Sequence, residues 1–201
     1  MQTIDAKLRS RIYGGGRGSV FTPNDFLDIG GRDAVDKALS RLTVKGTIRR
    51  LARGLYEYAR EHPELGTLSP DIEKVAKALA GKDRIRLQPA GAYATNLLGL
   101  SEQVPAKVVF LTDGPTRTVR IGNQTIQLRR TTPRNMAAAR RLSGLLMQAF
   151  RYLGRAHVTP ERIEHLKLTI PAKDRKQLLK DLPLAPAWMH TLFRELAGAT
   201  L

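Results

Sequence analysis

The sequence predicts an α+β protein whose N-terminal helices precede a short β-hairpin, followed by a mixed α/β part that ends in helices. Three observations predict this class. Apolar residues recur at helical spacing near both ends of the chain. In the middle, turn-forming pairs separate runs of β-prone residues. An apolar content of 42% is enough to build packed cores.

The first elements predicted are a helix and a short strand. Ile4, Leu8 and Ile12 are spaced as on one face of a helix. The glycine-rich run 14–18 ends that helix and lacks the lysine that closes a phosphate-binding loop, so a hinge is the preferred interpretation. Residues 19–21 are predicted to form the strand.

Two more helices are predicted next. The run from Thr22 to Asp25 has a capping hydroxyl, a proline and an acidic residue, which favour a helix start. Gly30 and Gly31 end this short helix, Asp33 is expected to cap the next one, and Gly46 ends it. The longer helix is expected to bury Val35, Ala38, Leu39 and Leu42.

A hairpin closes the first part. The runs 48–51 and 55–58 are β-prone and flank a turn at Ala52, Arg53 and Gly54. Helix, strand, helix, helix and hairpin follow one another in the order of a winged helix-turn-helix, and we assign this domain to residues 1–60.

A polar connector at residues 62–67 leads to a second domain at residues 68–201. This domain is predicted to be mixed α/β, with an antiparallel meander and C-terminal helices. Asp113-Gly114 and Gly122-Asn123 are turn signals between its strands. The expected elements are a helix after Ser69, a strand Arg84–Leu87, a helix Ala90–Leu98, the meander strands 107–112, 117–121 and 125–130, and helices around 142–153, after Thr159, around 178–182 and around 188–196.

The charge indicates a polyanionic partner. The chain has 34 Lys and Arg against 18 Asp and Glu, a formal net charge of +16. An excess of this size attracts nucleic acid, and also acidic surfaces of other kinds. No cysteine and no apolar run of membrane-spanning length are present, so a cytoplasmic protein without a membrane partner is expected.

No catalytic or metal-binding pattern stands out. The four histidines have no recognisable metal spacing, and no Ser-His-Asp order is compelling. We therefore expect neither enzymatic activity nor a cofactor. The histidines are His62, His157, His165 and His190.

The residue pattern favours a double-stranded DNA partner. The outward side of the third helix carries cations and a hydroxyl that suit the major groove, and the hairpin carries arginines that suit phosphates or the minor groove. The candidate DNA-binding residues are Arg32, Lys37, Ser40 and Arg41 on the helix, and Arg49, Arg50 and Arg53 on the hairpin.

Two alternatives stay open. The first part can be a protein-binding adaptor, and the charge also suits an RNA-binding or ribosome-associated protein, although aromatic residues are few at 5%. Three interpretations are open for the cations on the C-terminal helices: they are solvated surface residues, they extend the surface that contacts DNA, or they bind an acidic partner. They are Arg140, Arg141, Arg151, Arg155, Lys173, Arg175, Lys176 and Lys180.

Three runs carry a family resemblance. Residues 46–56 resemble the wing of AbiEi-type antitoxins of type IV toxin-antitoxin systems, and residues 88–94 and 110–122 look like their second domain. The resemblance implies a repressor of its own operon that binds inverted repeats with two copies, from a monomer or dimer in solution. It also implies a C-terminal domain that counteracts a nucleotidyltransferase toxin, and a DNA role for the cations named above.

Overall fold

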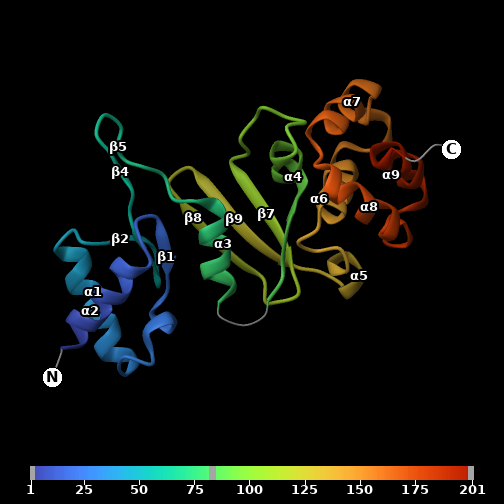
Figure 1. Cartoon of the computed structure of the whole chain (residues 1–201). Helices are drawn as coiled ribbons and strands as arrows, with labels where there is room; N and C mark the ends of the chain where they lie inside the picture. The colour runs from blue at the N-terminus through green and yellow to red at the C-terminus, as the bar shows by residue number, and fades with distance from the viewer. Residues whose placement is uncertain (1–2, 82–84, 199–201) are drawn as a thin grey trace. The chain divides into compact units, whose positions relative to one another are not determined.

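The computed structural model describes residues 3–81 and 85–198 (Figure 1). Helices and strands are mixed along the chain and helices occupy its C-terminal third, so the coarse α+β prediction is confirmed. Two compact units are present. The first comprises Met1–Ile85 with Val119–Gly122, and the second comprises Arg86–Thr118 with Asn123–Leu201.

The first unit begins with the elements expected from the sequence. The three strands form an antiparallel sheet in the order β1-β3-β2. The elements are α1 (Ile4–Gly14), β1 (Ser19–Phe21), the 3-10 helix η1 (Pro23–Phe26), α2 (Arg32–Val44), β2 (Arg49–Ala52) and β3 (Leu55–Tyr58).

Helix starts in this unit follow local chemistry, with one correction. Thr22 donates to the carboxylate of Asp25 from its backbone N and its hydroxyl at 2.7 and 2.9 Å, which fixes the start of η1. The expectation that Asp33 caps α2 is wrong. Gly31 has the extended backbone of the capping position, so Asp33 lies within the first turn, where its charge favours the positive end of the helix.

One core holds these elements together. Leu8, Val35 and Leu39 are fully buried, and burying a side chain of this size contributes about 1.5 to 3 kcal/mol. Phe21 packs edge-on against Phe26 and stacks on Tyr56. The buried members are Leu8, Ile12, Phe21, Phe26, Val35, Ala38, Leu39, Leu42, Ile48 and Tyr56.

The stretch expected to be a connector forms a small hairpin within the first unit. Strands β4 (Glu61–His62) and β5 (Gly66–Thr67) pair antiparallel. Helix α3 (Ile72–Ala80) follows and contacts β1. The carboxylate of Asp71 caps α3 by accepting from two backbone N–H groups of its first turn.

The strands that follow along the chain form a four-stranded sheet in the order β6-β7-β9-β8, and β6, β7 and β9 belong to the second unit. The elements along this stretch are β6 (Leu87–Ala90), α4 (Gly91–Leu97), β7 (Lys107–Thr112), β8 (Arg117–Ile121) and β9 (Gln124–Arg130). The strand expected at Arg84–Leu87 is found later, as β6, and Arg84 lies outside the described residues.

The expectation of an antiparallel meander is wrong. Strand β9 lies between β7 and β8 and pairs parallel to β7, with Phe110 opposite Leu128. Strand β7 buries Val108, Phe110 and Leu111 and β9 buries Ile126 and Leu128, whereas only Val119 is buried in β8. The more apolar strand thus occupies the central position, where both of its edges are paired.

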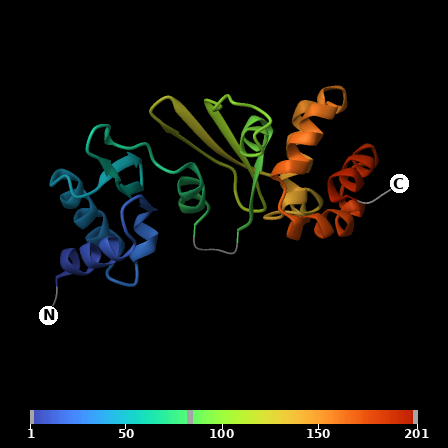
Figure 2. The same ribbon diagram turned by 45° about the horizontal axis from the view of Figure 1, so that its top comes forward.

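Helices complete the second unit (Figure 2). Phe150, Leu166 and Phe193 are fully buried in their common core, which confirms the four predicted helical regions. The elements are α5 (Pro133–Met136), α6 (Leu142–Leu153), α7 (Pro160–Thr169), α8 (Ala172–Lys180) and α9 (His190–Ala197), with 3-10 turns η2 (Arg155–His157), η3 (Leu182–Leu184) and η4 (Ala187–Met189). Within the described ranges, no helix has the length and apolar character needed to cross a membrane.

Candidate nucleic-acid interface

Helix α2 has one buried and one exposed face. Val35, Leu39 and Leu42 face the core. Lys37 and Ser40 are exposed one turn apart on the other side, so both sequence candidates are accessible to solvent. Val44, at the end of this exposed face, is 86% accessible to solvent.

Two further candidates on α2 are exposed but already hold acidic partners. Arg32 donates to Asp36 at 2.9 Å and to Asn24 at 3.0 Å. Arg41 donates to both carboxylate oxygens of Asp5, through Nε at 2.9 Å and Nη2 at 2.5 Å. These hydrogen bonds, donated by Arg41 and accepted by Asp5, lower the pKa of Asp5 and raise the pKa of Arg41. These pairs compete with any phosphate that approaches the helix.

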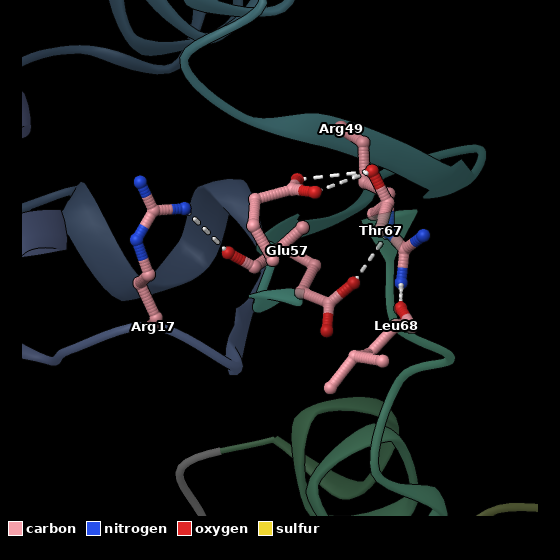
Figure 3. A network of polar contacts seen from close by, with 7 residues as sticks. Arg17, Arg49, Glu57, Thr67 and Leu68 are labelled. Carbon is pink, nitrogen blue, oxygen red and sulfur yellow. Dashed lines mark hydrogen bonds and ion pairs between the residues drawn. The ribbon is translucent and has the colours of Figure 1, made fainter. Parts of the chain in front are cut away.

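Arg49 belongs to a network inside the first unit (Figure 3). Its Nε donates to Glu57 Oε2 at 2.6 Å and its Nη2 donates to the carbonyl of Leu68 at 2.5 Å. Glu57 is 1% exposed, and its Oε1 has no hydrogen-bond partner within the described ranges. Arg49 therefore neutralises a buried carboxylate and ties β2 to the chain that follows β5. Its predicted contact with DNA would have to compete with these two partners.

A β-bulge decides which hairpin arginine is paired. Ala52 lies opposite Leu55, but the register then shifts, so that Arg50 lies opposite Tyr56 and Arg49 opposite Glu57. A regular two-residue hairpin at these positions would instead place Arg50 opposite Glu57. Because of the bulge at Leu51, Arg49 and not Arg50 lies opposite Glu57 and pairs with its carboxylate, and Arg50 is exposed.

The tip of the β2–β3 hairpin is cationic and exposed to solvent. Arg53 is exposed at the turn, and within the described part of the chain no ion pair holds it. Gly54 supplies the positive φ of 70° that the turn requires. Arg50 is exposed, and its Nε donates to the carbonyl of Ala52 at 3.3 Å.

The structure therefore separates the seven candidates. Lys37, Ser40, Arg50 and Arg53 are available on the surface of one unit, Arg32 and Arg41 are in surface pairs, and Arg49 is in the internal network. Residues that the sequence analysis did not single out include Val44 and Lys45, exposed at the end of α2. Helical spacing in the sequence could have predicted their exposure, because Val44 lies four residues after Ser40 and Lys45 lies four residues after Arg41.

No feature of the described residues suggests metal chemistry. Across the two described ranges, no group of three or more histidine, aspartate or glutamate side chains is placed to hold an ion. The arrangement can supply cations, a hydroxyl and an apolar contact to a partner.

The comparisons with known proteins give a family and no activity. Residues 7–178 match a family described as a family of unknown function (DUF6088). No curated protein matches the chain.

Proposed function

The chain belongs to the DUF6088 family of unknown function, and we propose that it is a DNA-binding transcriptional repressor that contacts the duplex through α2 and the β2–β3 hairpin. The first unit is then a winged helix-turn-helix, with α2 as the recognition helix and the hairpin as the wing. The proposed role is non-enzymatic and cytoplasmic.

The observation that carries this proposal is the exposed cationic tip of the hairpin that directly follows α2. Backbone bonds from Thr47 and Ile48 to the carbonyl of Leu42 turn the chain sharply from the helix into β2. Arg50 and Arg53 then extend from the hairpin without an acidic partner among the described residues. A cationic hairpin of this kind suits phosphates or a narrow minor groove.

On α2, Lys37 and Ser40 are the proposed base-reading residues. Lysine suits the acceptors of guanine in the major groove, and serine can pair with several base edges. Val44 offers an apolar contact for a thymine methyl group. Asp33 is exposed in the first turn and would repel phosphates, which restricts the approach of the duplex at that end.

Arg32 and Arg41 remain in the proposed interface as phosphate contacts. Each is now in an exposed ion pair, and such pairs are worth only about 0 to 1 kcal/mol. Exchange of the carboxylate for a phosphate therefore costs little. Arg49 is excluded from the interface because its departure would leave Glu57 buried without a counter-charge.

A mobility-shift measurement tests the repressor proposal. The protein is titrated into its own upstream DNA and into a scrambled duplex of equal length, at moderate salt. We expect tighter binding to the upstream DNA, with two copies on an inverted repeat. Lys37→Ala and Ser40→Ala should each reduce the preference by about tenfold, the size of one lost base contact.

Controls separate the alternatives. Lys176→Ala removes an exposed cation from α8 and should leave the preference unchanged. Equal affinity for both duplexes would overturn sequence-specific repression. Co-purifying RNA without promoter preference would favour an RNA-binding protein. A folded protein with no affinity for either nucleic acid would favour a protein-binding adaptor.

The resemblance to AbiEi-type antitoxins extends the proposal to the second unit, which we propose counteracts a nucleotidyltransferase toxin. The test is co-expression with a nucleotidyltransferase encoded next to this chain. Restored growth with the full chain, and also with the Arg50→Gln/Arg53→Gln variant, would support an antitoxin role independent of DNA binding. Growth arrest that the chain does not relieve would overturn it.

A further inference from the structure

The second unit contains a cavity lined by residues of α4, the end of α6, the start of α7 and the loop that joins α4 to β7. Its volume is about 300 Å³, at the lower end of the range for small-molecule sites. Leu100, Pro105 and Leu153 contribute apolar walls. Among the described residues that line it, Arg162 of α7 is the charged one. Apolar walls with a single cation suit a small ligand of matching chemistry.

One wall of the cavity, the loop between α4 and β7, is fixed by hydrogen bonds from side chains. Nδ2 of Asn96 donates to the carbonyl of Ser101 at 3.1 Å and to that of Gln103 at 3.3 Å. Oγ of Ser101 accepts from the backbone N of Gln103 at 3.3 Å. Nε2 of Gln124, in β9, donates to the carbonyl of Pro105 at 3.3 Å. The wall is therefore built before a ligand arrives, and a preformed site loses less conformational entropy on binding.

Two exposed apolar side chains from distant parts of the chain line this same cavity. Val104 of the loop is 71% exposed, and Tyr152 of α6 is 58% exposed. A single exposed apolar residue is ordinary on a protein surface. Two such residues at one cavity instead extend its apolar surface outward, and a ligand that covers them gains free energy from the apolar area it removes from water.

Arg162 supplies the polar end of the cavity. Its Nη1 donates to the carbonyl of His157, and this bond orients the guanidinium at the start of α7. A guanidinium has further N–H donors in the same plane, and these match the two oxygens of a carboxylate. Arg162 is half-buried, so an ion pair formed there is screened less by water than one on an open surface.

We propose that this cavity binds a small carboxylate with an apolar body, whose carboxylate pairs with Arg162 and whose body lies against Leu100, Leu153 and Tyr152. One guanidinium balances the single charge of a carboxylate, whereas a phosphate monoester carries close to two charges near neutral pH. A neutral apolar ligand would cover the guanidinium without pairing it, which costs free energy. The site belongs to the second unit and does not rest on the function proposed for the first.

The test follows the methyl NMR signals of Val104 and Leu153 in the full chain, assigned by their loss in Val104→Ile and Leu153→Ile. Phenylacetate, its neutral amide phenylacetamide, and acetate, which lacks the ring, are titrated separately. We expect saturable shifts with phenylacetate, binding about tenfold weaker with phenylacetamide, and no saturation with acetate. The methyl signals of exposed Val44, in the first unit, should not move. Shifts by phenylacetate that never saturate, or equal affinities for phenylacetate and its amide, would overturn the proposal.

Arg162→Gln separates a binding role from a structural one. It should weaken the binding of phenylacetate by about tenfold and leave that of phenylacetamide unchanged, so that the two probes bind alike. An equal loss for both probes would show that Arg162 acts only through its bond to His157, and would overturn the carboxylate site. Arg155→Gln is the matched control, because Arg155 is exposed on η2 and does not line the cavity. An equal loss of phenylacetate binding in the control would indicate attraction by net charge and would also overturn the site.

A variant that fills the cavity locates the binding. Ala106 lines the cavity and is exposed, so Ala106→Phe adds a ring there without changing the buried core. Both phenylacetate and phenylacetamide should lose their saturable binding, while the melting temperature stays near that of the parent chain. Unchanged binding of both probes to Ala106→Phe would place the ligand elsewhere and overturn the site.

Discussion

Arg49 lies opposite Glu57 across the β2–β3 hairpin and donates to its buried carboxylate at 2.6 Å. The carboxylate is 1% exposed, whereas Arg49 is 32% exposed. The arginine therefore sits at the boundary between core and solvent, where it can compensate a buried charge while its own desolvation stays partial. This pair stabilises the hairpin that presents Arg50 and Arg53.

Breaking this pair should destabilise the first unit. Arg49→Met leaves Glu57 buried without its counter-charge, and we expect the free energy of unfolding to fall by about 3 kcal/mol. The double variant Arg49→Met/Glu57→Met should regain most of this loss, since apolar side chains can replace a buried ion pair. Urea titration followed by circular dichroism measures both effects. An unchanged midpoint for Arg49→Met would show that the pair contributes nothing.

The exposed hairpin arginines should affect DNA binding without affecting stability. For Arg50→Gln/Arg53→Gln, we expect the slope of log affinity against log salt to become shallower by about 2, one for each lost phosphate contact. Fluorescence anisotropy at several salt concentrations measures the slope, and the urea midpoint should stay unchanged. A slope equal to that of the parent chain would remove these arginines from the interface.

The Arg41–Asp5 pair should compete with DNA. Asp5→Asn removes the carboxylate that holds Arg41, so the arginine becomes available to a phosphate and duplex affinity should rise, by about twofold to fivefold for an exposed pair. In the parent chain, the lowered pKa of Asp5 should move up towards its usual range when duplex is bound. NMR titration of the Asp5 carboxyl with and without DNA checks this. A pKa that stays low in the complex would mean that Arg41 keeps its partner.

The second unit should lose stability in acid through Asp113. Arg86 donates to this carboxylate from Nε at 2.7 Å and from its backbone N at 2.8 Å, and these bonds lower the pKa of Asp113. The folded pKa lies below the unfolded value of about 3.9, so the stabilisation is complete above that value and is lost as the pH falls through the folded pKa.

Asp113→Asn should therefore be less stable than the parent chain at pH 6, and the difference should shrink on acidification to pH 3 and below. Thermal melts at these pH values measure it. A constant difference across this range would assign the effect to lost packing rather than to the charge.

Gly144 should tolerate no larger residue. A Cβ atom at this position would lie 2.2 Å from the carbonyl oxygen of Ala138 and 2.7 Å from Oε1 of buried Gln88. Because the nearer atom belongs to the backbone, Gly144→Ala should destabilise the protein by about 1 to 3 kcal/mol. Gly14→Ala is the control, since nothing lies within 4 Å of its Cβ position and its φ is not positive. Equal urea midpoints for the two variants would contradict this reasoning.

The sequence by itself determined the local elements. Helical spacing of apolar residues predicted α6 at the bounds that the structure has, and turn signals located β7 and β8 in the same way. These features depend on residues within a few positions of one another, so periodicity and turn chemistry are sufficient to find them.

Only the tertiary structure decided which strands pair and which charges remain available. β9 rather than β8 joined β7 because burial of apolar side chains is a property of the whole sheet. Asp5 reaches Arg41 from 36 residues away, and the bulge at Leu51 gives Glu57 to Arg49 instead of Arg50. The physical reason is that an ion pair depends on distance in space and on burial, and neither follows from the order of residues along the chain.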